Sequence, residues 1–475
     1  MSDGLPPEAT GDQEAEELPQ ETEKPTVVVV EPEGELKQDP VDAQLETRLQ
    51  ERNAKIYAGL VSLIYLAAPV LYVGFVQAAL CDNLGTNKRI ANLPSSVYLL
   101  MAWFPVLIAW LVPQARLLKP TLVVSYSITA AMGAAVAVVL ILGAPPWLIV
   151  GSLVAHAAVL GCTNGVAATF NWEALGRGLS EARRGKALSM AFGVGPLFAV
   201  AGSLGAQLIL DGELFGWRPT AWAQVSYPYS FALLFGASAP IMALGAVLAR
   251  LYVIPMPATD VQREPFKTAV LGGFKEVCSY RILLIACVAY LLVYCGNMVQ
   301  NNMSLYTREV VDRPPESLVG YQLALRFGVK MLAGLLLGWI LARTNPKVPL
   351  LITVGLQIAG VLWVLFVPGY WFLVAFGING AGELFGVYYF NYPLCCSPKS
   401  QMRRNIAFLM LISAPVGLAP YMYGWISDVW SLRASFWVAL GILLFTTALV
   451  AKTLPSHPKP RPEDMRAADL AEETA

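Results

Sequence analysis

The stretch Tyr321–Trp339 reads YQLALRFGVKMLAGLLLGW, which is apolar enough to cross a bilayer but carries Arg326 and Lys330 near its middle. In an α-helix, steps of four residues place Gln322, Arg326 and Lys330 on one face. Each cation at the centre of a bilayer costs roughly 2.5–3.5 kcal/mol on insertion scales. Charged residues are kept within a membrane span where they face a partner or a water-filled path. We therefore expect these side chains to line a functional site.

The whole chain has the composition of a membrane protein. Of its 475 residues, 56% are hydrophobic and 14% are charged, whereas a soluble domain has about 25% charged residues. Twelve apolar segments have roughly the length that spans a bilayer. We therefore predict an all-α polytopic membrane protein with twelve transmembrane helices. The predicted spans are residues 56–80, 95–112, 121–142, 147–172, 187–210, 227–254, 282–305, 317–342, 348–367, 370–393, 406–430 and 434–451.

The two sets of six spans look like copies of each other. A shift of 220 residues lays Phe170-Asn171-Trp172 on Phe390-Asn391-Tyr392 and Arg183-Arg184 on Arg403-Arg404. Matches at one offset, at equivalent places in the hydropathy pattern, indicate an internal repeat. We expect an acidic N-terminal tail at 1–54, six-helix bundles at 55–254 and 282–454, a central connection at 255–281 and a C-terminal tail at 455–475.

The distribution of basic residues predicts the orientation in the membrane. If both termini are cytoplasmic, the inside flanks from Arg48 onward hold 23 Lys and Arg residues and the outside loops hold six. This bias follows the positive-inside rule. We expect a multi-pass protein of the plasma (inner) membrane with both termini in the cytoplasm. The first 52 residues hold 15 of the 33 acidic residues, and we expect the tail that they form to be disordered.

Two loops carry patterns of a known family. Ser180–Ala187 reads SEARRGKA, like an R-G-x-A start of a fifth helix, and Gly338, Arg343 and Lys347 have the spacing of a G-x-x-x-D-R-x-x-x-K loop in which Ala342 takes the aspartate position. With its two six-helix halves, the chain resembles the major facilitator superfamily over about residues 55–454. The resemblance implies transport by alternating access, with a substrate site between the halves. The basic residues predicted for the cytoplasmic gate or loops are Arg183, Arg184, Arg343, Lys347, Arg403 and Arg404. For the two Arg-Arg pairs the alternative is that they set the topology, anchor to lipid head groups and cap helix ends.

Glu383 is the carboxylate that the sequence places in the middle of a span, within NGAGELFG at 379–386. An isolated carboxylate in a low-dielectric environment takes up a proton, whereas one beside Arg326 or Lys330 stays ionised. Glu383 is therefore either a proton-coupling residue or one partner of a fixed structural salt bridge. Because the two cations exceed the one acid, we expect an anionic or zwitterionic substrate.

Polar residues within other spans are further candidates. Asn297, Gln300, Asn301 and Ser304 form one polar stripe, which either lines the path or bonds neighbouring helices. Tyr65 and Tyr72 share a face of the first span, and His156, Thr163, Asn164 and Asn171 share a face of the fourth; packing is the alternative reading for each. The predicted substrate-binding residues are Gln322, Arg326, Lys330, Asn297, Gln300, Asn301, Tyr72 and Asn164, with Glu383 for proton coupling.

These observations predict a secondary active transporter of a small polar, anionic or zwitterionic solute, coupled to protons. The alternatives are an anion exchanger without proton coupling, a transporter-like sensor or scaffold, and a symporter of neutral sugars or nucleosides. No nucleotide-binding P-loop or catalytic constellation is visible, so we expect neither an enzyme nor direct use of ATP. We expect no cofactor, no metal and no nucleic acid, and a monomer whose partners are the solute, protons and membrane lipids.

Overall fold

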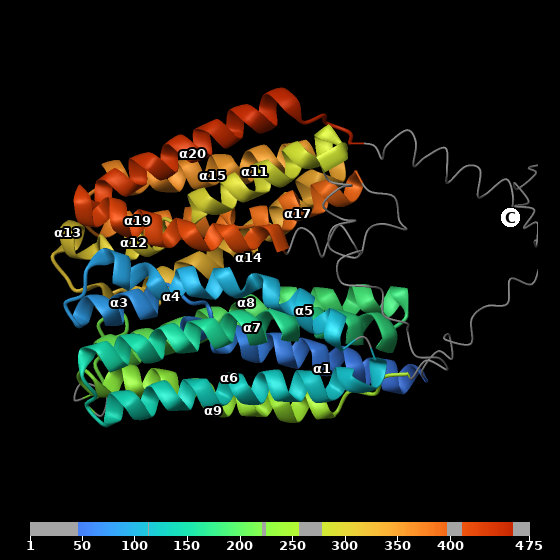
Figure 1. The fold of residues 1–475 in the computed structure, drawn as a ribbon, viewed down its shortest axis with the longest axis horizontal. Coiled ribbons are helices and arrows are strands. Elements are labelled where there is room, and N and C mark those ends of the chain that lie inside the picture. The colour runs from blue at the N-terminus through green and yellow to red at the C-terminus, as the bar shows by residue number, and fades with distance from the viewer. Residues whose placement is uncertain (1–45, 113, 221–224, 256–277, 397–410, 459–475) are drawn as a thin grey trace, which may run out of the picture. The chain divides into compact units, whose positions relative to one another are not determined.

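The apolar segments form long helices in two successive sets. The computed structural model describes residues 46–112, 114–220, 225–255, 278–396 and 411–458. Figure 1 shows the helices of each set running along a common direction. The first set comprises α1 (Thr47–Leu66), α2 (Ala68–Leu71), α3 (Phe75–Asn83), α4 (Lys88–Leu100), α5 (Phe104–Leu111), α6 (Leu118–Ile141), α7 (Pro146–Gly178), α8 (Glu181–Asp211) and α9 (Tyr229–Arg250).

The second set repeats this pattern in the other half of the chain. It comprises α11 (Arg281–Asn297), α12 (Gln300–Leu305), α13 (Thr307–Val311), α14 (Val319–Arg343), α15 (Lys347–Phe366), α16 (Val374–Gly382), α17 (Phe385–Cys395), α19 (Leu418–Val429) and α20 (Leu432–Thr453). The short 3₁₀ turn η4 (Pro315–Ser317) precedes α14. Among the described residues, ten helices are long and apolar enough to cross a membrane. The all-helical fold class is confirmed.

Two of the twelve predicted spans are not among these ten helices. The span predicted at 56–80 is divided among α1, α2 and α3. The span predicted at 406–430 begins outside the described residues and continues into α19. Residues 47–54 of the predicted N-terminal tail belong to α1. Residues 1–45 of that tail, most of the central connection and most of the C-terminal tail lie outside the described residues, as do Arg403 and Arg404. The division of the chain into two tails, two six-helix bundles and a central connection therefore remains a prediction.

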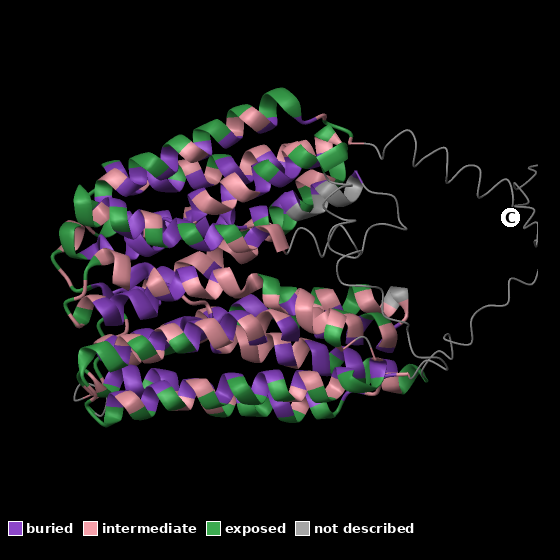
Figure 2. Cartoon of the chain, in the orientation of Figure 1, coloured by how far each residue is buried: buried purple, intermediate pink, exposed green. Residues whose placement is uncertain are grey.

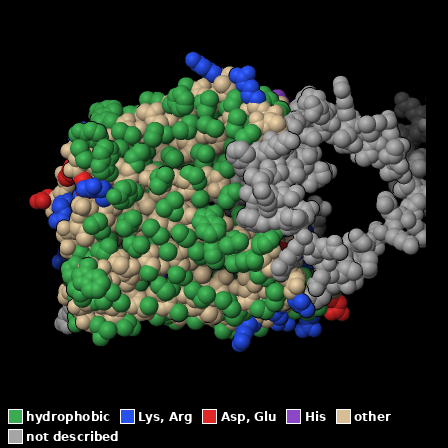
Figure 3. Space-filling model, viewed as in Figure 1, with side chains coloured by type: hydrophobic (Ala, Val, Ile, Leu, Met, Phe, Trp, Pro, Cys, Tyr) green, Lys and Arg blue, Asp and Glu red, His purple; other side chains and the backbone are tan. Residues whose placement is uncertain are grey.

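The helices are buried toward one another and apolar on the outside. Within the first half α6 packs against α7 and α9, and α1 packs against α8; within the second, α16 packs between α14 and α15. Large apolar side chains remain exposed, among them Leu142, Trp147 and Leu335, whose exposed fractions are 72–76%. Figure 2 shows exposed residues along outer helices such as α9 and α20, and Figure 3 shows hydrophobic side chains over the face with charges near its two ends. This distribution suits a surface in contact with lipid.

Two of the helix pairs that join the halves meet at what we call the distal end, the end of the bundle opposite the start of α1 and the end of α20. There α4 packs against α19, and α8 packs against α14. A Cβ added to Gly424 of α19 would lie 2.5 Å from the Lys88 carbonyl oxygen, so this crossing requires a residue without a side chain. Gly320 makes a similarly close approach to α8 at Ser203 and Gln207.

Each of these contacts includes a helix start that is held by a side chain of the other half. The Asp428 carboxylate accepts hydrogen bonds from the Lys88 amide (2.7 Å) and the Arg89 amide (3.1 Å) at the start of α4. The Gln207 amide oxygen accepts from the Gly320 amide (3.1 Å), and its nitrogen donates to the Ser317 carbonyl (2.7 Å). Two ion pairs also connect the halves: Arg89–Asp428 (3.0 Å) and Arg308–Asp82 (2.7 Å). The distal end is closed in this conformation.

Candidate substrate site

Three helix interruptions surround one central cavity. The first lies between α2 and α3 at Tyr72 to Gly74, the second between α11 and α12 at Met298 and Val299, and the third between α16 and α17 at Glu383 and Leu384. Interrupted helices recur at the binding sites of transporters, because irregular backbone is tolerated within a membrane where it lines a cavity. The interruptions therefore mark this cavity as the candidate site.

The cavity has a volume of about 250 Å³ and takes residues from both halves of the chain. Its charged lining residues are Arg326, Lys330 and Glu383. Its other lining residues are Tyr72, Val73, Phe75, Ser95, Tyr98, Leu99, Tyr290, Tyr294, Asn297, Met298, Gln300, Asn301, Phe385 and Gly386. Because α14 supplies the two cations and the third interruption supplies the acid, helix packing decides whether the three charges meet.

The three charges do meet. Arg326 Nη2 lies 2.6 Å from Glu383 Oε1, and Lys330 Nζ lies 3.2 Å from Glu383 Oε2. The exposed fractions of the side chains are 15% for Arg326, 27% for Lys330 and 6% for Glu383. Since the pairing keeps one carboxylate beside two cations, the described lining of the cavity carries a net charge of +1.

Neighbouring groups orient Arg326. Its guanidinium lies 5.2 Å from the centre of the Phe75 ring and 5.8 Å from that of Phe327, within the range of cation–π attraction. A Cβ on Gly380 would collide with the Arg326 backbone, so this glycine lets α16 approach α14 closely. Arg326 Nε is buried without a hydrogen-bond partner among the described residues. One donor of the guanidinium is thus left for a further acceptor.

The predicted amide stripe divides into two kinds of residue. Asn297, Gln300 and Asn301 all line the cavity. Asn301 Nδ2 donates to Ser95 Oγ (2.8 Å) and Asn92 Oδ1 (3.2 Å), so this amide also bonds the two halves together. Asn297 Nδ2 is buried without a hydrogen-bond partner among the described residues. The Gln300 amide lies beside the Glu383 carboxylate without a hydrogen bond of regular geometry.

Gln322 and Asn164 do not line the cavity. Gln322 accepts from Ser304 Oγ (2.6 Å) and donates to Thr307 Oγ1 (2.8 Å), so its amide joins α14 to α12 and α13. Asn164 hydrogen-bonds Tyr98, which does line the cavity. These two residues are therefore placed to support the site rather than to touch its contents.

Aromatic lining residues were not among the sequence candidates, except for Tyr72. Tyr72 stacks on Tyr65 with ring centres 6.2 Å apart, and Tyr294 lies 5.3 Å from Phe385. One signal could have found Tyr290 and Tyr294: they lie four residues apart, on the helix face that continues to Asn297. Phe75, Tyr98 and Phe385 carry no comparable pattern in the sequence.

The described basic residues of the predicted gate loops lie outside the cavity. Arg183 donates to the Thr47 carbonyl (2.9 Å) and lies 3.5 Å from Glu51, while Arg184 donates to the Gly176 carbonyl (3.0 Å). In the second half, the Arg343 guanidinium lies 4.1 Å from the Trp339 ring centre, and Lys347 Nζ donates to the Ala451 carbonyl (2.8 Å). Their gate roles remain predictions.

The polar residues of the fourth span are packed among helices. His156 is fully buried, with its ring edge-on to Phe235 at 5.3 Å and neither nitrogen hydrogen-bonded among the described residues. Thr163 pairs with Thr129 (2.8 Å), and Asn171 donates to Tyr126 Oη (2.7 Å). Within the part of the chain that the structure describes, no cluster of three or more His, Cys, Asp or Glu could hold a metal ion.

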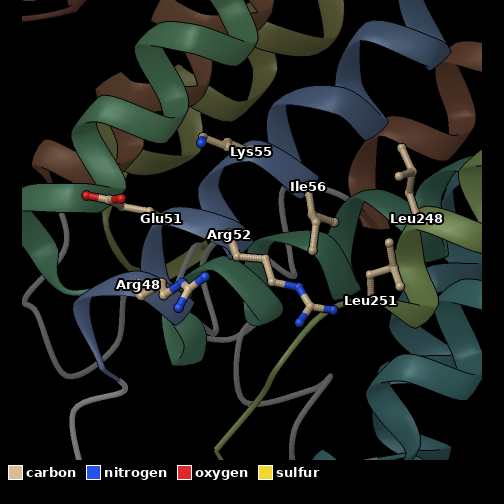
Figure 4. A pocket seen from close by; sticks show the side chains of 7 residues that line it. All are labelled: Arg48, Glu51, Arg52, Lys55, Ile56, Leu248 and Leu251. Carbon is tan, nitrogen blue, oxygen red and sulfur yellow. The ribbon is translucent and has the colours of Figure 1, made fainter.

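A second concave surface lies at the end of the bundle opposite the distal end. This groove, of about 490 Å³, is lined by Arg48, Glu51, Arg52, Lys55 and Ile56 of α1, by Leu248 of α9 and by Leu251 directly after it. Figure 4 shows the basic side chains on one helix, Leu248 on the other and Leu251 just beyond its end. Basic groups beside apolar ones suit the headgroup and chain of an anionic lipid. Contact with membrane lipids remains a prediction, and this groove is a candidate site for it.

The fold is shared with solved transporter structures of low sequence identity. The nucleoside transporter NupG superposes with a TM-score of 0.61 at 11% identity, over 84% of this chain and 98% of that chain. A POT family transporter in complex with 5-aminolevulinic acid gives 0.65 at 13%, over 84% and 95%. A D-xylose-proton symporter gives 0.62 at 15%, over 85% and 98%. These likenesses show the fold.

Sequence comparison identifies the family. No curated protein sequence matches the chain. The family model described as Major Facilitator Superfamily matches residues 57–397, which is more than half of the chain. Together with the membrane-spanning helices and the fold of the solved transporters, this match identifies the chain as a member of the Major Facilitator Superfamily of membrane transporters.

Proposed function

We propose that the protein is a secondary active transporter that carries a small anionic solute together with a proton. The observation that supports this most strongly is the cluster of Arg326, Lys330 and Glu383 in a cavity between the two halves. Glu383 balances the charge of one of the two cations. The second cation leaves a positive charge that a substrate anion can neutralise.

The geometry suggests how an anion and a proton could bind together. In this conformation Glu383 is paired with both cations, and this pairing favours its ionised form. A substrate anion competes with Glu383 for Arg326 and Lys330. Once those cations turn to the substrate, Glu383 is left in a low-dielectric environment, where a carboxyl group favours its protonated form. Proton binding at Glu383 then accompanies anion binding, which is the requirement for symport.

The closed distal end fits one state of an alternating-access cycle. Contacts between the halves at Asp428 and Gln207 hold that end shut, so transport requires them to break while contacts at the other end form. If both termini are cytoplasmic, as the distribution of Lys and Arg predicts, the distal end is the outer end and the observed state is closed to the outside.

Thermal unfolding of the purified protein tests the anionic site. We expect stabilisation by members of a panel of small carboxylates and phosphates, but not by sugars or nucleosides. A compound at about 100 times its dissociation constant adds roughly 2.7 kcal/mol of stability. Lys330→Ala should abolish this stabilisation, whereas Lys347→Ala, which removes a cation outside the cavity, should retain it. Stabilisation by neutral compounds alone, unchanged in Lys330→Ala, would contradict the anionic site.

Transport in proteoliposomes tests the proton-coupling role. With an anion that stabilises the protein, we expect an imposed pH gradient to drive accumulation. Glu383→Gln removes the group that carries the proton, so gradient-driven accumulation should be lost while exchange of internal for external anion continues. Glu173→Gln, at an acid paired with Arg177 outside the cavity, is the control. Accumulation that survives Glu383→Gln refutes this role, and a wild-type protein that only exchanges would be the anion exchanger.

A further inference from the structure

The central cavity is lined by aromatic side chains from both halves as well as by charges. Tyr294 lies 5.3 Å from Phe385 and 5.8 Å from Tyr290, with the rings tilted to each other. Aromatic rings attract other rings in offset or edge-on arrangements, and such pairs add to the effect of burial. The six aromatic side chains that line the cavity are Tyr72, Phe75, Tyr98, Tyr290, Tyr294 and Phe385. A wall of this kind favours a flat, apolar ring over a hydroxyl-rich one.

The charge of the cavity favours a ligand with a single negative charge. Among its described lining residues, Arg326 and Lys330 are opposed by Glu383 alone. While Glu383 stays ionised, one anionic group brings the total to zero, and a second would leave an excess negative charge in a buried site. The ammonium of a zwitterion would need a carboxylate, and in this conformation it would have to compete with Arg326 and Lys330 for Glu383.

Two residues that line the cavity each carry an unused hydrogen-bond donor. Arg326 Nε and Asn297 Nδ2 are buried and have no acceptor among the described residues. Unsatisfied buried donors are costly, so an acceptor from a bound ligand would relieve them. A carboxylate provides two acceptor oxygens, and its planar shape matches the guanidinium group of Arg326.

We infer that the substrate is a small aromatic monocarboxylate. Its carboxylate would bind at Arg326, Lys330 and Asn297, and its ring would lie among the aromatic side chains. A cavity of about 250 Å³ can hold a molecule of the size of benzoate or phenylacetate. This inference rests on the proposed anion transport and narrows it to one chemical class.

Binding of benzoate to the purified full-length protein, measured from concentration-dependent thermal unfolding, tests the inference. Cyclohexanecarboxylate matches its size and charge without the aromatic ring, and we expect it to bind about tenfold more weakly. Benzamide keeps the ring without the charge, and we expect a loss of about ten- to hundredfold because charge-assisted hydrogen bonds disappear. Terephthalate and phenylalanine, a dianion and a zwitterion, should also bind at least about tenfold more weakly.

Substitutions of the aromatic lining residues test whether the cavity prefers an aromatic ring. Phe385→Leu should weaken benzoate binding about three- to tenfold while leaving cyclohexanecarboxylate unchanged. Phe192→Leu is the matched control, because Phe192 is 48% exposed on α8 and does not line the cavity. A Phe385→Leu protein that fails to fold can be replaced by Tyr290→Leu on the neighbouring wall.

The possible results separate this inference from the transport proposal. Equal binding of benzoate and cyclohexanecarboxylate, with no effect of either wall variant, overturns the aromatic class but leaves the anion site intact. The same conclusion follows if benzoate and phenylacetate do not bind while another anion of the panel does. Binding of benzamide as strong as that of benzoate, retained in Lys330→Ala, overturns both.

Discussion

Replacing Asp428 should open the distal end of the transporter. Asp428 belongs to the second half, but its carboxylate accepts from the Lys88 and Arg89 amides at the start of α4 in the first half. Its side chain is 14% exposed, and the Arg89 side chain that pairs with it is 40% exposed. These contacts must break whenever the halves separate at this end. Asp428→Asn removes the charge and weakens all of them together.

The expected shift follows from the contacts. A side chain that caps a helix start contributes about 0.5–2 kcal/mol, and a negative charge at that position adds about 0.3–1 kcal/mol. The exposed ion pair with Arg89 adds little, about 0–1 kcal/mol. Because Asn retains part of the capping, we expect a loss of about 2 kcal/mol, which corresponds to a roughly 30-fold shift of the closed-to-open ratio.

Distances between spin labels at the distal end measure this ratio. Leu142→Cys after α6 and Tyr370→Cys after α15 are exposed positions in the two halves, to be labelled in a background whose native cysteines are replaced by alanine. The long-distance population should rise in Asp428→Asn. Glu213→Gln is the control, since Glu213 pairs with Arg218 within one half at the same end. An unchanged distance distribution in a folded Asp428→Asn protein refutes the reasoning.

Three further predictions concern other parts of the molecule. Gly424→Ala would place a Cβ 2.5 Å from the Lys88 carbonyl oxygen, so the same spin labels should report a more open distal end. An unchanged distribution of label distances would contradict this and show that the two backbones can shift apart. Burial and the nearby Asp82 charge raise the pKa of Glu316 above its usual 4.5, against the opposing effect of Arg308. The native state then loses stability as pH rises through that raised pKa, so Glu316→Gln should raise the melting temperature at neutral pH and flatten its pH dependence; a lower melting temperature would contradict this. Arg52→Gln combined with Lys55→Gln should reduce stabilisation by phosphatidylglycerol relative to phosphatidylcholine, measured by thermal unfolding in mixed micelles, and an equal lipid response of both proteins would exclude the groove as a headgroup site.

The membrane fold and the charged residues of the site follow from strong local signals. Arg326, Lys330 and Glu383 stand out because ionisable residues within apolar helices are costly. The sequence left open whether Glu383 meets either cation, since that depends on how α16 packs against α14. The close approach at Gly380 permits this packing, and the structure pairs the acid with both cations.

Other parts of the site could not be predicted because the signals were ambiguous. Gln322 shares a helix face with Lys330, but eight residues of helix extend about 12 Å, and its amide ends among Ser304 and Thr307 instead of in the cavity. Aromatic lining residues such as Phe75 and Phe385 resemble the lipid-facing and core residues around them. Only the arrangement of helices distinguishes a ring that lines a cavity from one that packs in a core.

The net charge of the described cavity lining links the proposed cycle to the membrane potential. Without substrate, the ion cluster carries +1; with a monoanion and a proton on Glu383 it again carries +1, so the loaded and empty steps would move the same charge in opposite directions. Voltage would then neither drive nor oppose net symport. An anion bound without the proton would bring the cluster to zero, and each cycle would move one charge, worth about 2.3 kcal/mol per 100 mV. Measurement of the transport current therefore tests whether the proton is carried together with the anion.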